Sequence, residues 1–433
     1  MFTYTITDRK ERRLLLLICT VVLIVSAAVV LSYNDYFFLG DPLKPNNDDV
    51  KYIQSAKVLL NEGTLVYNSG KDPSAFIMPA FVFILSGFMA VFGQDGGGVI
   101  AFRLFQCLLQ AGSIYLIFII ARYMFNSRIA WAACILSALY LPDYFSSGVI
   151  LSEAIFRVLI LVLVCVTITA VQKKHWGFYA GIGALVAAAA YFKPHASLYP
   201  AILLILWWMD KYSWREMLRY MSIIAAVYIV LLLPWWIRNL ITFDQWITFT
   251  NSGGSPFLLG TRINYQLPPE GFFDAYPQYD PKTIFQGSNS TAVAKGLDVL
   301  SYGFTHEPLT YLYWYTLGKL KGLYLEAYYW RPIWSISKAA MITIQATLVT
   351  LSVIGMIFAR KLTTLKRQMP VVLTVIYFTV IYMPFVAFSR YGYPNMVFLL
   401  IYTAIPVVYV VSKLSRNRRR TRSKSTSAID LKG

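Results

Sequence analysis

Apolar runs of close to 20 residues recur along the whole chain, and they constrain its fold more than any other feature. The first run, Leu14–Leu31, follows the basic stretch Arg9–Arg13. A helix needs about 20 apolar residues to cross the roughly 30 Å of hydrocarbon in a bilayer. Hydrophobic residues make up 57% of the chain and charged residues only 14%, whereas a soluble domain has about 25% charged residues. The sequence therefore predicts an all-α polytopic membrane protein.

Positive charges gather in short connections between the apolar runs. The net charge of +18 would suit a nucleic-acid-binding protein if the charges formed one surface. They lie instead in separate short segments, as in loops that stay in the cytoplasm. We therefore expect the bilayer, with its anionic headgroups, to be the partner and expect no nucleic acid. The basic segments are Arg9–Arg13, Arg122–Arg128, Lys173-Lys174, Lys211–Arg219, Arg360–Arg367 and Lys413–Lys432.

The basic flanks at both ends of the chain require an even number of crossings, but eleven apolar stretches are visible. The weakest stretch is Phe76–Phe92, which contains Pro79 and Gly87 and is followed by a connection without Lys or Arg. We expect this stretch to lie along the outer surface and about ten others to cross the membrane. The expected spans are 14–33, 99–121, 129–142, 151–171, 177–192, 196–209, 217–236, 337–359, 369–388 and 394–412.

This topology divides the chain into three parts with two long outer loops. We expect a basic cytoplasmic N-terminus over 1–13, a transmembrane domain over 14–412 with outer loops 34–75 and 237–338, and a basic cytoplasmic tail over 413–433. In the first loop, apolar residues recur at helical spacing over Asp49–Asn61. The second loop is expected to contain a helix over Glu307–Tyr324.

Charged residues stand at the outer ends of several expected spans, where desolvation makes charge costly and functional roles common. Asp48 and Asp49 precede the amphipathic stretch, and one of them could be its N-cap. Glu153 opens the fourth span and could pair with Arg157 one helical turn later.

Three cations, Lys193, Arg238 and Arg390, lie at outer span ends, although basic residues prefer the cytoplasmic side. Each could anchor to headgroups by snorkelling. Three such cations together suggest a bound anion. A carboxylate can take a proton from an acceptor hydroxyl, and Lys or Arg can stabilise a phosphate leaving group. This inventory suits the transfer of a group from a lipid-linked phosphate.

Several short motifs, in order and spacing, resemble the GT-C superfamily of polytopic glycosyltransferases. The branch they resemble contains protein O-mannosyltransferases and lipid A aminoarabinose transferases. The motifs are Asp48-Asp49-Val50-Lys51-Tyr52 followed by Gly63, Pro79 with Gly93 and Arg103, Leu151-Ser152-Glu153, Pro234–Asn239 followed by Gly253-Gly254, and Arg390-Tyr391 with Pro394. The resemblance implies a GT-C-like bundle with juxtamembrane helices on the outer face.

The resemblance also implies a reaction and its residues. The donor would be a polyprenyl-phosphate sugar, and Asp48 would be the catalytic base of an inverting transfer to a hydroxyl. The acceptor (a lipid, glycan or protein) and the sugar are left open. The further catalytic residues would be Asp49 and Glu153, and the donor would be held by Lys193, Arg238, Arg390 and Tyr52.

Other readings of the chain remain open at this stage. No metal is expected to be obligatory, although Asp48, Asp49 and Glu153 are oxygen ligands suited to Mg²⁺ or Mn²⁺. A lipid flippase or transporter would need ionisable groups near mid-membrane. A polymerase or ligase of surface polysaccharide would use a pyrophosphate carrier. We expect a bacterial plasma membrane protein whose active site faces outward.

The surface position of Phe76–Phe92 can be tested by labelling single cysteines. An impermeant thiol reagent applied to intact cells should label a cysteine at Gly96 but not one at Lys173. If Phe76–Phe92 crossed the membrane, both cysteines would lie on the same side and would react alike.

Overall fold

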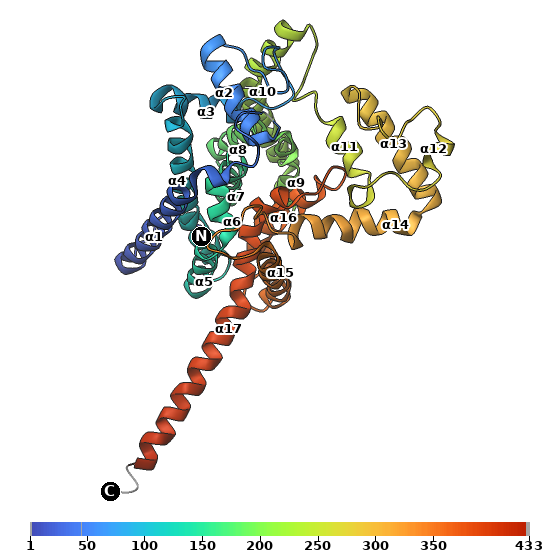
Figure 1. Cartoon of the computed structure of the whole chain (residues 1–433). Coiled ribbons are helices and arrows are strands. Elements are labelled where there is room, and N and C mark those ends of the chain that lie inside the picture. Colours follow the sequence, from blue (N-terminus) through green and yellow to red (C-terminus); the bar gives the residue numbers. More distant parts are fainter. Residues whose placement is uncertain (1, 45, 430–433) are drawn as a thin grey trace.

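Six helices are long and apolar enough to cross a membrane, and they pack into one bundle (Figure 1). The computed structural model describes residues 2–44 and 46–429, with side chains described up to Ser415. Helices and connecting segments make up this part of the chain, which contains no strand. The six helices are α1 (Arg9–Tyr33), α4 (Gly97–Met124), α7 (Glu153–Lys173), α10 (Trp214–Phe243), α15 (Lys338–Ala359) and α17 (Ser389–Ile429).

The other four expected spans are also helical, but each is short or bent. α5 (Ser127–Ala138) and α6 (Leu141–Gly148) meet at an angle of 51°, and Pro142 opens the second helix. α16 ends at Val380 rather than at the expected Phe388, because Pro384 disfavours helix in the residues before it. The number of crossings remains a prediction. The remaining helices are α8 (Trp176–Ala190), η2 (Pro194–Leu198), α9 (Ala201–Met209) and α16 (Leu365–Val380).

The helix in the Phe76–Phe92 region is too short to span a bilayer. α3 (Ala80–Phe92) has 13 residues and is therefore about 20 Å long at 1.5 Å per residue. It packs against α2 (Asp48–Glu62) and α4 at one end of the bundle (Figure 1). α2 matches the predicted amphipathic stretch, and it ends at Gly63, which has a φ of 69°. Both short helices have the size expected of surface elements.

Small residues let the long helices approach closely. A Cβ added to Gly183 of α8 would lie 2.7 Å from the carbonyl oxygen of Ile224 in α10. A Cβ at Gly355 of α15 would overlap the carbonyl oxygen of Tyr402 in α17. Such close backbone contacts are the usual basis of helix packing in membranes, where apolar residues gain little by leaving the lipid.

The basic loops that were predicted to share one side of the membrane lie at one end of the bundle. The 21 residues of α7 separate Glu153 from Lys173 by about 30 Å. Beside the Lys173 end, the backbone amide of Phe2 donates to the Gln172 side chain. Ion pairs at that end join Arg122 to Glu11, Lys174 to Glu216 and Lys366 to Asp210. α17 continues into the predicted tail, of which residues 430–433 lie outside the described part.

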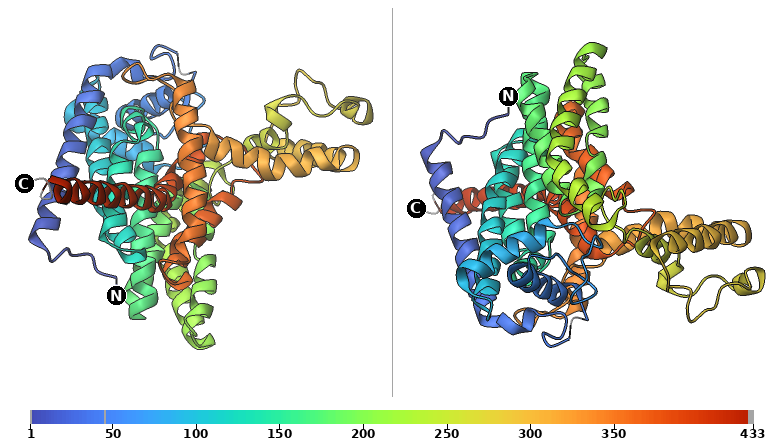
Figure 2. Two further views of the ribbon diagram at one scale, coloured as in Figure 1. Left: turned by 90° about the horizontal axis from the view of Figure 1, so that it is seen from below. Right: turned by 90° about the horizontal axis from the view of Figure 1, so that it is seen from above.

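A lobe formed by the second long outer loop stands off the bundle, and both views of Figure 2 show it on one side. Its small core contains Leu258, Phe272 and Val299. The predicted helix over 307–324 is confirmed as a helix over 308–325, in which wider π-type turns follow α14. The helices of the lobe are α11 (Gly254–Gly260), α12 (Phe272–Ala275), α13 (Asn289–His306) and α14 (Pro308–Tyr313).

A buried ionic cluster ties three helices together inside the bundle. Arg157 of α7 forms an ion pair with Asp143 of α6, and the Tyr393 hydroxyl of α17 lies 3.0 Å from both partners. Arg157 and Asp143 are both almost fully buried. The predicted pairing of Arg157 with Glu153 therefore does not form, because Arg157 points into the bundle and meets a partner on another helix.

Replacing Arg157 with methionine should lower the free energy of unfolding by about 3–5 kcal/mol, because Asp143 becomes an uncompensated buried charge. Thermal unfolding in detergent measures the change. As a control, Lys366→Met breaks an exposed ion pair and should cost about 0–1 kcal/mol. Equal effects of the two substitutions would contradict the structural role assigned to Arg157.

Candidate active site

The two adjacent aspartates at the start of α2 have different surroundings. Asn47 is the N-cap, so Asp48 and Asp49 are the first two residues of the helix. Neighbouring helical side chains diverge by about 100°. The carboxylate of Asp49 points inward and accepts from the backbone amides of Leu39, at 2.6 Å, and Gly40, at 3.2 Å. Asp49 is fully buried and fastens the segment that leads into α2.

Asp48 points in a different direction from Asp49, and each of its carboxylate oxygens has a partner. Oδ1 accepts from the Tyr67 hydroxyl at 2.7 Å, and Oδ2 lies 2.8 Å from Nη1 of Arg390. Burial raises the pKa of the Asp48 carboxyl, but Arg390, the Tyr67 hydroxyl and Lys51 outweigh burial and bring the pKa below its ordinary value. The side chain of Asp48 is still 35% exposed, so a ligand can reach it.

A second ion pair joins Glu153 to Lys193. Glu153 is the first residue of α7, and Lys193 stands between α8 and η2. Oε1 of Glu153 lies 2.9 Å from Nζ of Lys193, and both side chains are buried. Among the described residues, Oε2 of Glu153 has no hydrogen-bond partner. Lys193 therefore holds one oxygen of Glu153, and the other oxygen is available to accept a hydrogen bond.

Tyr391 connects the two ion pairs. Nη2 of Arg390 donates to the Tyr391 hydroxyl at 2.9 Å, and Nζ of Lys193 lies 5.0 Å from the centre of the Tyr391 ring. Tyr52 of α2 lies beside this group, because its ring centre is 5.5 Å from that of Tyr67, whose hydroxyl donates to Asp48. We call the cluster of Asp48, Arg390, Glu153, Lys193 and Tyr52 the charged centre. It unites five of the seven predicted site residues.

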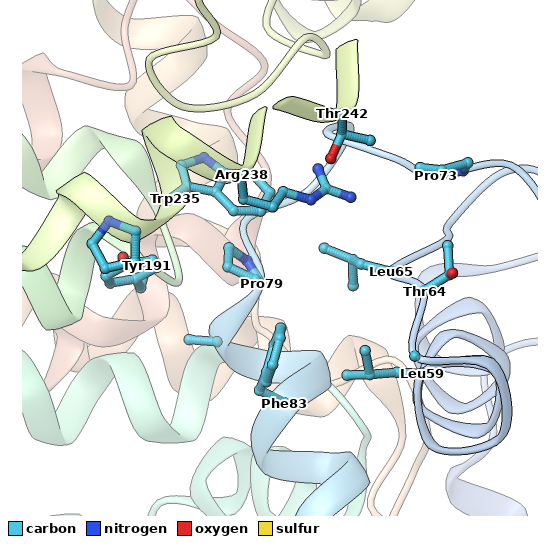
Figure 3. A pocket seen from close by; sticks show the side chains of 13 residues that line it. Leu59, Thr64, Leu65, Pro73, Pro79, Phe83, Tyr191, Trp235, Arg238 and Thr242 are labelled. Atoms are coloured by element: carbon cyan, nitrogen blue, oxygen red, sulfur yellow. The ribbon is translucent and has the colours of Figure 1, made fainter. Parts of the chain in front are cut away.

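Arg238 lies apart from the charged centre, at the rim of an apolar cavity of about 510 Å³ (Figure 3). Nη1 donates to the carbonyl oxygen of Ser74 at 3.1 Å and to the Asn239 side chain at 2.9 Å. Figure 3 shows the guanidinium above Phe83 and Leu59. The lining comprises Leu59, Gly63, Thr64, Leu65, Pro73, Pro79, Ala80, Phe83, Tyr191, Pro234, Trp235, Arg238 and Thr242.

The cavity and the charged centre are built from the same two segments. Leu65 lines the cavity, and Tyr67 two residues later holds Asp48. Tyr191 lines the cavity, and Lys193 two residues later pairs with Glu153. A single cation at the rim of an apolar cavity therefore lies next to a cluster of paired charges.

Two comparisons with known proteins agree with this arrangement. Residues 72–237 match the family described as dolichyl-phosphate-mannose-protein mannosyltransferase. The fold resembles the oligosaccharyltransferase of Archaeoglobus fulgidus, with a TM-score of 0.55 and 11% identity over 94% of this chain and 52% of that chain. Part of the chain thus matches a mannosyltransferase family model, and its fold resembles that of an archaeal oligosaccharyltransferase. The expected all-α polytopic membrane fold is confirmed.

Further structural matches have the same low identity. The Archaeoglobus enzyme tethered to an acceptor peptide gives a TM-score of 0.53 with 11% identity, covering 92% of this chain and 50% of that chain. ArnT from Cupriavidus metallidurans bound to undecaprenyl phosphate gives 0.43 with 14% identity, covering 92% and 78%. The chain spans about half the length of the oligosaccharyltransferase that it resembles. No curated protein matches its sequence.

Each of the three carboxylates considered as metal ligands has another partner. The oxygens of Asp49 accept from backbone amides, Glu153 is paired with Lys193, and Asp48 is paired with Arg390. Over residues 2–44 and 46–429, no group of three or more His, Cys, Asp or Glu side chains is placed to hold a metal ion. The described geometry does not fit an Mg²⁺ or Mn²⁺ site.

Two tyrosines of the site were not predicted as site residues. Tyr391 follows Arg390 in a motif, but nothing in the sequence connects it to Lys193. Tyr67 lies in a segment without helical periodicity, and its position depends on backbone contacts such as Ser74 N to Leu65 O. The one indication of Tyr67 in the sequence is that this tyrosine lies close to the acidic pair Asp48-Asp49.

Asp48 should make protein stability depend on pH. Because the pKa of Asp48 is depressed in the folded state, its contribution is present above the ordinary value of about 3.9 and is lost as the pH falls through the lowered pKa. The Asp48→Asn variant should therefore melt at a lower temperature than the unchanged protein at pH 6, with the difference shrinking toward pH 2.5. The exposed Asp72 provides the matched control, Asp72→Asn. A constant difference across this range would contradict the ion pair.

Proposed function

We propose that the chain is an inverting glycosyltransferase that moves a sugar from a polyprenyl phosphate to an acceptor hydroxyl. The observation that carries the proposal is the charged centre next to an apolar cavity with a guanidinium at its rim. The family matched by residues 72–237 is described by a sugar carried on a polyprenyl phosphate, dolichyl-phosphate-mannose. An isoprenoid phosphate combines the two properties that the cavity selects for, an apolar chain and an anionic head.

The reaction needs one base and a set of cations. A carboxylate oxygen of Asp48 takes the proton of the acceptor hydroxyl while the hydroxyl oxygen attacks the anomeric carbon. The bond between the anomeric carbon and the phosphate oxygen breaks, and polyprenyl phosphate leaves with the bonding electrons. Attack opposite the leaving group inverts the anomeric configuration. Cations of Arg390, Lys193 and Arg238 stabilise the charge that develops on the phosphate.

The ion pair between Asp48 and Arg390 would couple donor binding to the strength of the base. In the described structure Arg390 is the closest cation to Asp48 and lowers its pKa. A bound phosphate would compete for Arg390, so the pKa of Asp48 would rise and the carboxylate would become a stronger base. Asp48 would then be most basic when a donor is in place.

The remaining residues would orient the reactants. Oε2 of Glu153 is buried without a partner among the described residues and can accept from a sugar hydroxyl. Tyr52, whose ring packs against Tyr67, could contact the donor. Asp49 would act at a distance, by fixing the backbone before α2. The acceptor could be a lipid, a glycan or a protein, because the acceptor side of the centre is not defined by these contacts.

The proposal includes an orientation in the membrane. The end of the bundle with the basic loops would face the cytoplasm, as would both termini. The charged centre, at the other end of α7, would then face outward, in our proposal from a bacterial plasma membrane. A donor with its tail between the spans and its phosphate at the cavity would meet acceptors there.

Purified protein in nanodiscs, incubated with a panel of labelled polyprenyl-phosphate sugars, tests the proposal by chromatography of the lipid products. Replacing Asp48 with asparagine keeps its size and should lower turnover by about 10²–10⁴-fold, because the base is lost. Asp72→Asn, which removes an exposed carboxylate from the same loop, should leave turnover unchanged.

Three outcomes would overturn parts of this account. Full turnover in Asp48→Asn would exclude Asp48 as the base. Movement of lipid across the bilayer without release of sugar from any donor would instead identify a flippase. Release of sugar only from pyrophosphate carriers would favour a ligase or polymerase of surface polysaccharide.

A further inference from the structure

The helix over 308–325 has one packed side and one bare side. On the packed side, Nε1 of Trp314 donates to the carbonyl oxygen of Gly260 at 3.0 Å, and Tyr311 packs against Gly303. Lys319 is buried and donates to the carbonyl oxygen of Phe385 at 2.8 Å. The exposed residues include four large apolar side chains, Leu309, which is 80% exposed, and Leu312, Tyr313 and Leu317, together with Thr310 and Thr316.

The four exposed apolar residues lie in one row along the helix. Positions 309, 312, 313 and 317 recur at the spacing of neighbours on a helix surface. No residue from Leu309 to Gly318 is charged. Single exposed apolar residues are ordinary on protein surfaces, but a continuous row indicates a partner. We call this row the apolar row.

The attachment of the helix determines where the apolar row lies. Gly322 packs against the carbonyl oxygen of Ala387, and Gly392 packs against that of Leu323. The helix therefore leaves the bundle beside the first residues of α17, at the end where that membrane helix begins. In Figure 1, α11, α12 and α13 lie above α14, whereas α15 and α17 extend below it. The side of α14 away from α11, α12 and α13 is therefore the side toward which the long helices α15 and α17 extend.

We propose that the apolar row rests in the headgroup region of the adjacent leaflet, so that the lobe is supported by the lipid surface. Uncharged leucine and tyrosine side chains on one helix face are typical of helices that lie in a membrane interface. The helix that carries the row is attached to the bundle beside the start of α17, which is long and apolar enough to cross a membrane. The inference rests on the membrane fold and is independent of the proposed chemistry.

Lipid support of the lobe would also hold in place the chain segment that precedes Arg390. The backbone amide of Val386 donates to the carbonyl oxygen of Pro256, and that of Ala387 donates to the Tyr265 hydroxyl, both at 3.0 Å. These bonds fix the segment just before Arg390 to the lobe. A lobe held at constant height on the bilayer would therefore hold this segment in place.

Depth-dependent fluorescence tests the inference. Single cysteines at Leu312 and Leu317, and at the exposed Ser301 of α13 as control, are labelled with an environment-sensitive dye in a Cys19→Ala background. Each protein is placed singly in nanodiscs that contain phosphatidylcholine brominated in its acyl chains. We expect quenching by brominated lipid to be at least threefold stronger at 312 and 317 than at 301, and quenching by aqueous iodide to show the reverse order.

Equal iodide quenching at all three positions would overturn the inference, because the apolar row would then lie in water. Strong protection from iodide without quenching by brominated lipid would also overturn it, since a protein surface rather than lipid would cover the row. All three labels are on exposed side chains, so folding should be retained, and gel filtration of each variant checks this.

Discussion

The ion pair between Asp48 and Arg390 joins residues that are 342 positions apart in the sequence. One stands on the first turn of α2 and the other on the first turn of the last long helix, α17. A half-exposed ion pair contributes little free energy by itself. Its importance is geometric, because it brings the first long outer loop onto the end of the bundle. Tyr67 and Tyr391 then fix the remaining atoms of the two partners.

The charges of the site are paired with one another in the free protein. Two cations and two carboxylates form two ion pairs, and Tyr391 connects them. Pairing lowers the cost of holding charge at a membrane boundary. Under the proposed function, a donor phosphate would exchange places with a carboxylate as the partner of a cation. The same contacts that stabilise the free site would then become the contacts that respond to the donor.

Much of the helical framework could be predicted from the sequence, because crossing a bilayer requires runs of apolar residues. Each of the ten ranges expected to span contains a helix, and the weak stretch at 76–92 contains the short helix α3. The partner of Arg157 could not be predicted, since spacing along one helix says nothing about Asp143 on another. The lobe was largely missed, because α13 lies between segments rich in Gly, Pro and Asn.

The site was only partly predictable. The family motifs identified Asp48, Glu153 and Arg390, and the search for outer cations identified Lys193; the structure brings these four residues together. They also grouped Arg238 with these residues, although it lies at the neighbouring cavity. The order of motifs along the sequence does not give the distance between side chains in the fold. That distance depends on packing, which decides the side of a shared segment on which each side chain lies.

The central claim is that the cavity beside the charged centre binds an isoprenoid phosphate, and photo-crosslinking tests it without knowledge of the sugar. A polyprenyl phosphate with a diazirine on the isoprene unit next to the phosphate is irradiated with the protein in nanodiscs, and the modified peptides are identified by mass spectrometry. The account predicts adducts within residues 59–83 and 234–242, which line the cavity. Adducts confined to the opposite end of the bundle, around Tyr123 and Gln172, would contradict it.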